Sequence, residues 1–235
     1  MTSKDRKDYN NRLFNTNWIR KKYHSARFEW AGEIFVRKNL STEHILELGC
    51  FDGRLLSYIP SPAEYVGIDG DWEGGLSAAR RKFAGRADRI FIESVSPTSL
   101  KSFQADYFDT FASLETMEHI PPELIDAYLA EIARVVNGDI LITVPNEKGP
   151  VLLLKQAAKK IIKSHGEPYS LGELLNATLG RMSHIRRDQH KGFDYSLLIQ
   201  QIQRHFNVMS VTGLPFTALP PLLNLTIAIH ARTKK

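Results

Sequence analysis

Short apolar runs alternate with segments of helical length through the middle of this 235-residue chain. The runs lie at 44–48, 65–68, 89–92, 107–114 and 140–144. Helices are expected between them at 54–59, 73–83 and 122–136. Parallel strands that are joined by helical crossovers form a sheet with helices on both faces, because such crossovers are right-handed. The alternation therefore predicts a doubly wound α/β fold.

Two more strands are expected near the C-terminus. Residues 195–205 have helical spacing, and strand-like runs follow at 207–211 and 223–231. Added to the five earlier runs, these strands predict a Rossmann-like, seven-stranded mixed sheet that ends in an antiparallel hairpin at one edge.

The chain is expected to contain one folded domain with an N-terminal extension. Residues 1–40 are predicted to form a basic arm followed by a helix that begins near residue 27, and residues 41–235 are predicted to form the domain itself. At about 146–190 the regular alternation is lost. We interpret this stretch as an insertion that covers the carboxyl ends of the strands as a lid.

Composition and the N-terminal residues limit the class of protein and the cellular compartment to be expected. A hydrophobic fraction of 43% and a charged fraction of 24% are typical of a globular chain with its own core. The single cysteine, Cys50, excludes an internal disulfide framework. Charged residues at 4–8 stand where a signal peptide needs apolar ones, and no apolar run approaches the roughly 18 residues of a membrane span. We therefore expect a cytoplasmic protein.

The segment Ile-Leu-Glu-Leu-Gly-Cys-Phe-Asp-Gly at 45–53 is typical of a ligand-binding loop. Gly49 and Gly53 lack a Cβ, so the backbone can approach a ligand closely. The next strand ends in Asp69, where a carboxylate can accept hydrogen bonds from two ribose hydroxyls. Glu47 would repel a diphosphate but would attract the ammonium of a methionine moiety. These residues disfavour a dinucleotide.

This segment resembles the first motif of the class I S-adenosylmethionine-dependent methyltransferases, an acid followed by x-G-x-G-x-G. Glu47, Gly49 and Gly53 match that motif, and Phe51 replaces its middle glycine. The resemblance extends over roughly residues 40–145 and implies S-adenosylmethionine as cofactor. The cofactor-binding residues that it implies are Glu47, Gly49, Cys50, Phe51, Gly53, Asp69, Glu93, Ser94 and Leu114.

A second cluster of polar residues follows the fourth expected strand. Glu115, Glu118 and His119 have the spacing i, i+3, i+4, which shares one face of a helical turn, and His190 closes the insertion. These carboxylates and imidazoles suit Mg²⁺, Mn²⁺ or Zn²⁺. The pattern E-x-x-E-H resembles the metal-dependent branch of the family, small bacterial-type O-methyltransferases and small-RNA 3′-terminal 2′-O-methyltransferases included. That resemblance implies a metal which binds neighbouring hydroxyls of the acceptor.

The alternative for this cluster is an ordered turn without a metal. Glu118 and His119 would then precede the helix start at 121–122, and His190 would be a loop residue. In that case His119 or His190 is the candidate general base, because a histidine of near-neutral pKa can accept a hydroxyl proton. The predicted catalytic residues are accordingly His119, His190 and Glu118.

The insertion carries a basic amphipathic segment at 151–163. Lys155, Lys159 and Lys163 lie four residues apart, opposite a broad apolar surface. Such a helix either makes a peripheral contact with an anionic membrane or packs as a lid with its lysines in water. Further positive residues either hold an anionic group of the acceptor or form a solvated face; they are Arg181, Arg186, Arg187 and Lys191.

The residues together favour an O-methyltransferase that acts on a hydroxyl of a sugar, glycan or similar small polar metabolite. One alternative is an RNA 2′-O-methyltransferase, and another is a non-catalytic cofactor-binding or scaffold protein. A net charge of +5 without a separate RNA-binding module makes nucleic acid the weaker choice of partner. Nothing in the sequence specifies an oligomeric state.

Overall fold

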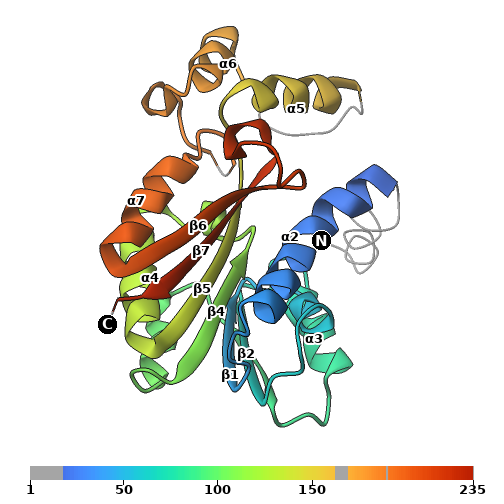
Figure 1. Ribbon diagram of the computed structural model, residues 1–235, viewed down its shortest axis with the longest axis vertical. Coiled ribbons are helices and arrows are strands. Elements are labelled where there is room, and N and C mark those ends of the chain that lie inside the picture. Colours follow the sequence, from blue (N-terminus) through green and yellow to red (C-terminus); the bar gives the residue numbers. More distant parts are fainter. Residues whose placement is uncertain (1–17, 162–168, 189, 235) are drawn as a thin grey trace.

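The computed structural model describes residues 18–161, 169–188 and 190–234 and contains the expected seven-stranded mixed sheet (Figure 1). The strands are β1 (His44–Leu48), β2 (Glu64–Asp69), β3 (Arg89–Glu93), β4 (Phe108–Leu114), β5 (Val136–Pro145), β6 (Phe206–Leu214) and β7 (Thr226–Thr233). Their order is β3-β2-β1-β4-β5-β7-β6, and β7 runs antiparallel to both β5 and β6. The predicted Rossmann-like fold with a C-terminal hairpin is confirmed.

Helices cover both faces of the sheet (Figure 1). They are α2 (Trp18–Arg37), α3 (Gly75–Lys82), α4 (Pro122–Val135), α5 (Pro150–Ile161), α6 (Leu171–Thr178) and α7 (Tyr195–His205). Side chains alternate along each strand, so Leu46 and Val66 join the core under α4 and α7, whereas Ile45 and Tyr65 join the core under α2. This alternation places Glu47 and Asp69 on the α2 face, at the carboxyl ends of their strands.

The connection between β1 and β2 differs from the sequence prediction. A helix was expected at 54–59, but the structure has a single 3₁₀ turn at Arg54–Ser57. Pro60 and Pro62 follow at once. Proline has no N–H to donate and disfavours helical geometry in the residue before it, so the helix cannot lengthen.

The N-terminal helix belongs to the main body of the fold. Six side chains of α2 are buried in the same core as β1 and the 3₁₀ turn after it: Ala26, Phe28, Trp30, Ala31, Ile34 and Phe35. The helix begins at Trp18, earlier than the predicted start near residue 27. Residues 1–17 of the expected arm lie outside the described residues.

The insertion forms a small unit at the end of the sheet where β5 finishes (Figure 1). We call residues 150–161 and 169–188 the cap; it contains α5, α6 and a 3₁₀ turn at Met182–His184. Its own apolar cluster consists of Leu152, Ala177, Met182 and Ile185. No helix in the described part of the chain is long and apolar enough to cross a membrane.

Truncation of Phe35 tests whether α2 is integral to the core. The side chain is 2% exposed, so Phe35→Ala should lower the free energy of unfolding by about 3–5 kcal/mol through lost burial and the cavity left behind. The neighbouring Val36 is 71% exposed, and Val36→Ala is the matched control, with little expected effect. Urea denaturation measures both, and similar values for the two variants would contradict the packing described.

Candidate active site

The loop after β1 has a backbone that ordinary residues rarely adopt. Gly49, Phe51 and Gly53 have φ angles of 78°, 47° and 69°, all in the left-handed region. A Cβ at Gly49 would collide with the side chain of Thr116, which follows β4. Glycine is therefore required at 49 for the loop to lie against the turn after β4.

Asp69 ties this loop to the end of β2. One of its carboxylate oxygens accepts a hydrogen bond from the backbone N–H of Phe51 at 2.9 Å, and the other accepts one from the N–H of Asp71 at 2.8 Å. Burial raises the pKa of Asp69, and these two hydrogen bonds oppose the rise. A carboxylate has about four acceptor positions, so two remain for hydroxyl groups of a ligand.

Glu47 is buried beneath the loop. Its carboxyl group accepts a hydrogen bond from the hydroxyl of Tyr65, which is also buried. Burial raises the pKa of Glu47 to about 8. A nearby cation would favour the ionised form, so the position is suited to an ammonium group of a ligand.

The other residues predicted to bind cofactor lie at the same end of the sheet but differ in what they expose. The side chains of Cys50 and Leu114 are buried in the α2 core, and Cys50 packs against Gly67, so only their backbone faces the loops. Glu93 is exposed at the end of β3, and the N–H of Ser94 donates to the carbonyl of Asp69 at 2.9 Å. All four residues therefore lie at the carboxyl ends of the strands, and their contact with a cofactor stays a prediction.

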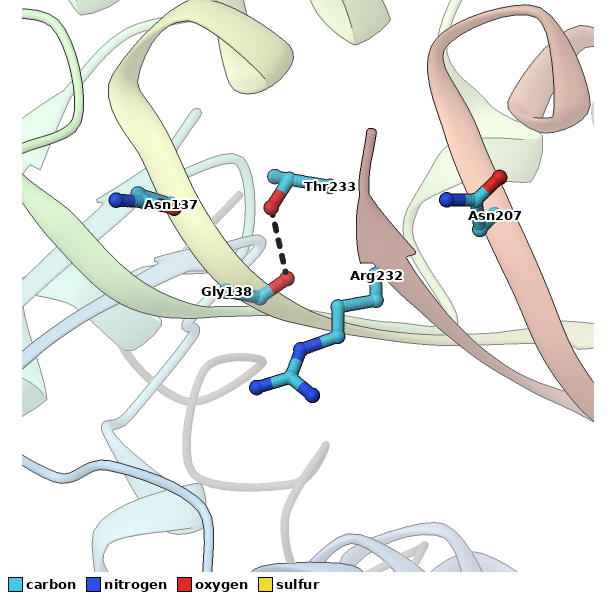
Figure 2. A pocket seen from close by; sticks show the side chains of 5 residues that line it. All are labelled: Asn137, Gly138, Asn207, Arg232 and Thr233. Carbon is cyan, nitrogen blue, oxygen red and sulfur yellow. Dashed lines mark hydrogen bonds between the residues drawn. The ribbon is translucent and has the colours of Figure 1, made fainter. Parts of the chain in front are cut away.

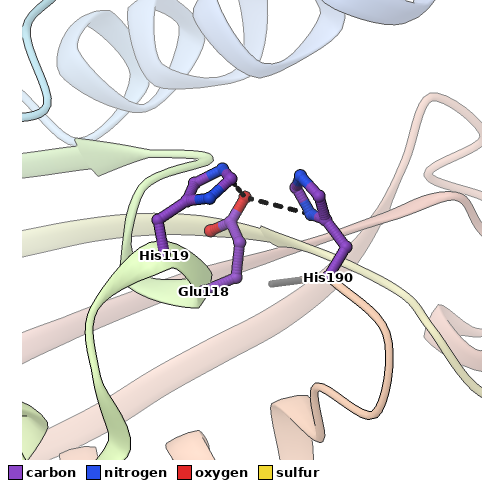
Figure 3. Close-up of side chains that lie close together, drawn as sticks. All are labelled: Glu118, His119 and His190. Atoms are coloured by element: carbon purple, nitrogen blue, oxygen red, sulfur yellow. Dashed lines mark ion pairs between the residues drawn. The ribbon is translucent and has the colours of Figure 1, made fainter. Parts of the chain in front are cut away.

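Three of the predicted acceptor-site residues lie close together (Figure 3). Glu118 and His119 belong to the turn after β4, and His190 belongs to the loop before α7. Glu118 Oε1 lies 3.9 Å from His119 Nε2 and 3.9 Å from His190 Nδ1. The two imidazole rings are 4.5 Å apart and nearly perpendicular. One potential ligand atom from each side chain lies within 4.8 Å of the other two, a spacing at which one metal ion can be held.

Burial governs the charge of these groups. It raises the pKa of Glu118 well above its usual value, and the neighbouring Glu115 adds to the rise. Both carboxylate oxygens of Glu118 are buried without a hydrogen-bond partner among the described residues. Burial and the nearby Arg187 lower the pKa of His119, so this imidazole is neutral at neutral pH. The site thus combines a buried carboxyl group whose oxygens accept no hydrogen bond from the described residues with a nitrogen base of lowered pKa.

Glu115 was predicted to be one of four metal ligands, but it does not belong to the group that Glu118, His119 and His190 form. Its backbone φ is 58°, so the residue lies outside the 3₁₀ turn at Met117–His119 that carries Glu118 and His119. Its carboxyl group is instead within the electrostatic influence of Arg27 and Lys155, which oppose the rise in pKa that burial causes.

Arg27 of α2 is a residue of this site that sequence reasoning missed. Burial raises the pKa of Glu47, Glu115 and Glu118, and the positive charge of Arg27 opposes the rise at all three. The Nε atom of Arg27 is buried and has no hydrogen-bond partner among the residues that the structure describes. No motif marks Arg27 in the sequence, because it reaches the site only through the packing of α2.

Three basic residues of the insertion have structural partners. Lys155 is not on a water-facing stripe as predicted: its Nζ lies 2.5 Å from Glu147 Oε1, at the end of β5. Arg187 donates to the backbone carbonyl of Glu118 at 3.0 Å, and Lys191 pairs with Glu173 at 3.0 Å. The structure does not describe the side chains of Lys159 and Lys163. Only Arg181 and Arg186 of the predicted anion-binding set are exposed.

A hollow at the opposite ends of the strands does not belong to this site (Figure 2). It is lined by Asn137, Gly138, Asn207, Arg232 and Thr233. Asn137 and Gly138 begin β5 and Thr233 ends the antiparallel β7, so the hollow lies at the amino ends of the parallel strands. Open α/β sheets bind ligands at the carboxyl ends, where Asp69 and Glu118 lie.

Comparison with known proteins identifies a domain family and similar folds. Residues 45–139 match a protein family described as a methyltransferase domain. No curated protein matches the sequence.

Several solved structures share the fold over nearly the whole chain. The PH0226 protein from Pyrococcus horikoshii OT3 has a TM-score of 0.62 at 14% identity and full coverage of both chains. Magnesium protoporphyrin IX methyltransferase from Synechocystis PCC 6803, with bound SAH, has a TM-score of 0.60 at 16% identity and 97% coverage of each chain. The methyltransferase domain of bacterial CtHen1 has a TM-score of 0.60 at 14% identity, covering 89% of this chain and 99% of that one.

Replacement of Glu47 by glutamine is expected to change how stability depends on pH. The pKa of about 8 in the folded protein exceeds the ordinary value of 4.5, so the unfolded chain loses this proton first as the pH rises. Wild-type stability should therefore fall between these values, by about 1.4 kcal/mol per pKa unit, and Glu47→Gln should not show this loss. Urea denaturation at several pH values measures the difference, and parallel pH profiles would contradict the burial of an ionisable Glu47.

Proposed function

We propose that this chain, in which residues 45–139 match a methyltransferase domain, is a class I S-adenosylmethionine-dependent enzyme that methylates a hydroxyl oxygen of a sugar, glycan or similar small polar metabolite. The observation that carries the proposal is the group of Glu118, His119 and His190 at the carboxyl ends of the strands, beside the loop that Asp69 holds. An imidazole whose pKa is lowered, as that of His119 is, suits the removal of a hydroxyl proton when it lies next to a buried carboxyl group.

The cofactor-binding part of the proposal rests on the two acids of the α2 face. Asp69 is placed to accept hydrogen bonds from the ribose hydroxyls, and Glu47 to pair with the ammonium of the methionine moiety. Gly49 allows the backbone to approach the ligand. S-adenosylmethionine supplies an already activated methyl group, so the protein has only to align the acceptor and remove its proton.

The proton-removal part rests on the two histidines. His119 is held neutral by burial and by Arg187, and therefore can accept a proton from a hydroxyl group. His190 faces it across the carboxyl group of Glu118 (Figure 3). We assign His119 and His190 as the candidate bases and Glu118 as the group that stabilises the resulting imidazolium.

We extend the proposal to a divalent cation held by the same three side chains. The two unpartnered oxygens of Glu118 and one nitrogen each from His119 and His190 form a donor set that suits Mn²⁺ or Zn²⁺. The cation would bind the acceptor hydroxyl and lower its pKa. An acceptor with two neighbouring hydroxyls, as on a sugar ring, fits such a centre best.

A second candidate acceptor is the terminal ribose of an RNA, which also offers two neighbouring hydroxyls. The E-x-x-E-H pattern favours it, because that pattern resembles the enzymes that methylate small-RNA ends. Binding of RNA should then weaken steeply with salt, since phosphate contacts release counterions. Transfer of labelled methyl groups to a panel of sugars, glycans and RNA ends decides between the two, and transfer to none of the panel would count against O-methylation.

Removal of the Asp69 carboxylate is expected to weaken cofactor binding. S-adenosylhomocysteine should raise the melting temperature of the wild-type protein, and Asp69→Ala should lower its affinity roughly tenfold to a hundredfold through lost hydrogen bonds to a charged group. Asp126→Ala is the matched control, because Asp126 pairs with Arg204 on the surface of α4. An equal thermal shift in Asp69→Ala and wild type would exclude Asp69 as the ribose acid.

Substitutions in the acceptor cluster should separate turnover from cofactor binding. We expect Glu118→Gln, His119→Ala and His190→Ala to lower methyl transfer by about a hundredfold or more and to abolish Mn²⁺ binding in calorimetry. The thermal shift by S-adenosylhomocysteine should remain in all three. His184→Ala, an exposed histidine of the cap, is the control. Full turnover in both histidine variants would refute the assigned bases, and unchanged Mn²⁺ binding would refute the metal centre.

A further inference from the structure

Exposed apolar side chains gather at one end of this molecule. Fifteen large hydrophobic residues are exposed in the described part of the chain, and nine of them belong to the cap or to the loop between β6 and β7. These nine are Leu153, Leu154, Leu171, Leu175, Leu179, Phe216, Leu219, Leu222 and Leu223. The loop contacts the cap, since the side chain of Leu222 lies against Gly149 at the entry to α5. Soluble surfaces rarely concentrate apolar residues in this way without an interaction partner.

The most exposed of these residues form a stripe along α6. Leu171, Leu175 and Leu179 recur every fourth residue and therefore share one face of the helix. They are 88%, 62% and 57% exposed. The opposite face of α6 packs on α5 through Ala177, so the cap turns its leucine face away from its own core.

The net positive charge of the cap favours an anionic partner. Its two described stretches hold six Lys and Arg against two Asp and Glu, so they carry four of the five net positive charges of the chain. Arg181 and Arg186 are exposed next to α6. A second copy of the chain would bring the same positive charge to the contact, and like charges repel. Anionic lipid headgroups attract these cations while the bilayer accepts the leucines.

We propose that the cap binds peripherally to an anionic membrane surface, with Leu171, Leu175 and Leu179 inserted at the headgroup level. The contact surface is α6 with the exposed arginines after it, and it differs from the lysine face of 151–163 that the sequence predicted. Arg187 links the cap to the carbonyl of Glu118. Docking therefore brings the acceptor cluster near the lipid headgroups, and a lipid-linked hydroxyl acceptor follows if the proposed function holds.

Flotation of the full-length protein with lipid vesicles tests this surface. The wild-type protein should float with vesicles of phosphatidylcholine and phosphatidylglycerol and remain largely unbound with phosphatidylcholine alone. The variant with Leu171→Ser, Leu175→Ser and Leu179→Ser should lose at least about a hundredfold in vesicle affinity. A variant with Arg181→Gln and Arg186→Gln should lose roughly tenfold, and salt should weaken wild-type binding.

A control variant removes the same number of exposed apolar side chains away from the cap. Val36→Ser, Leu197→Ser and Met209→Ser change residues that are 71%, 50% and 59% exposed, and this variant should float as the wild type does. Absence of wild-type flotation with anionic vesicles, or equal flotation of the α6 variant, would overturn the proposal. So would a wild-type dimer in light scattering that the α6 variant abolishes, because the leucines would then bind a second copy.

The thermal shift by S-adenosylhomocysteine separates this proposal from the proposed function. All the vesicle-binding variants should keep the shift, which also shows that they are folded. Absence of flotation by a wild-type protein that keeps the shift refutes the membrane surface alone. Absence of the shift in the wild-type protein refutes the methyltransferase site and leaves the vesicle result standing.

Discussion

The two hydrogen bonds that the Asp69 carboxylate accepts are the contact on which the candidate site depends. They join the loop after β1, through Phe51, to the turn after β2, through Asp71. Asp71 in turn accepts a hydrogen bond from the N–H of Leu76 at 3.0 Å and so fixes the start of α3. The half-buried carboxylate of Asp69 thereby helps to set the relative positions of two strand ends and a helix. A preorganised loop of this kind needs no rearrangement to receive a nucleoside.

Local sequence was sufficient to predict the parts of the site that lie within one strand–loop–helix unit. The glycine-containing loop and the acid at the end of the next strand predict Glu47, Gly49 and Asp69 at the carboxyl ends of two adjacent strands, and the structure has them at the ends of β1 and β2. The seven-stranded sheet was predictable for the same reason, because the alternation of apolar runs and helices specifies the crossovers. The shorter turn at Arg54–Ser57 shows where a proline overrides helical spacing.

The parts that depend on packing between distant segments were not predictable. Helical periodicity places Lys155 on one face of α5 but does not say which face is buried, and its partner Glu147 belongs to a different element. Arg27 reaches the acids only because α2 packs on β1. Glu115 was expected to be a ligand with Glu118, but its backbone is left-handed and its carboxyl group does not join the group of Glu118, His119 and His190. Each difference arises where tertiary contacts, and not residue spacing, decide the direction of a side chain.

The central claim is that S-adenosylmethionine binds at the ends of β1 and β2, above Glu47 and beside Asp69. Calorimetric titration of the purified protein with S-adenosylhomocysteine tests it most directly. We predict saturable binding of one ligand per chain with a micromolar dissociation constant, and release of a proton near neutral pH as Glu47 ionises beside the ligand's ammonium. No binding heat across a range of temperatures, from a protein that is folded by circular dichroism, would contradict the account.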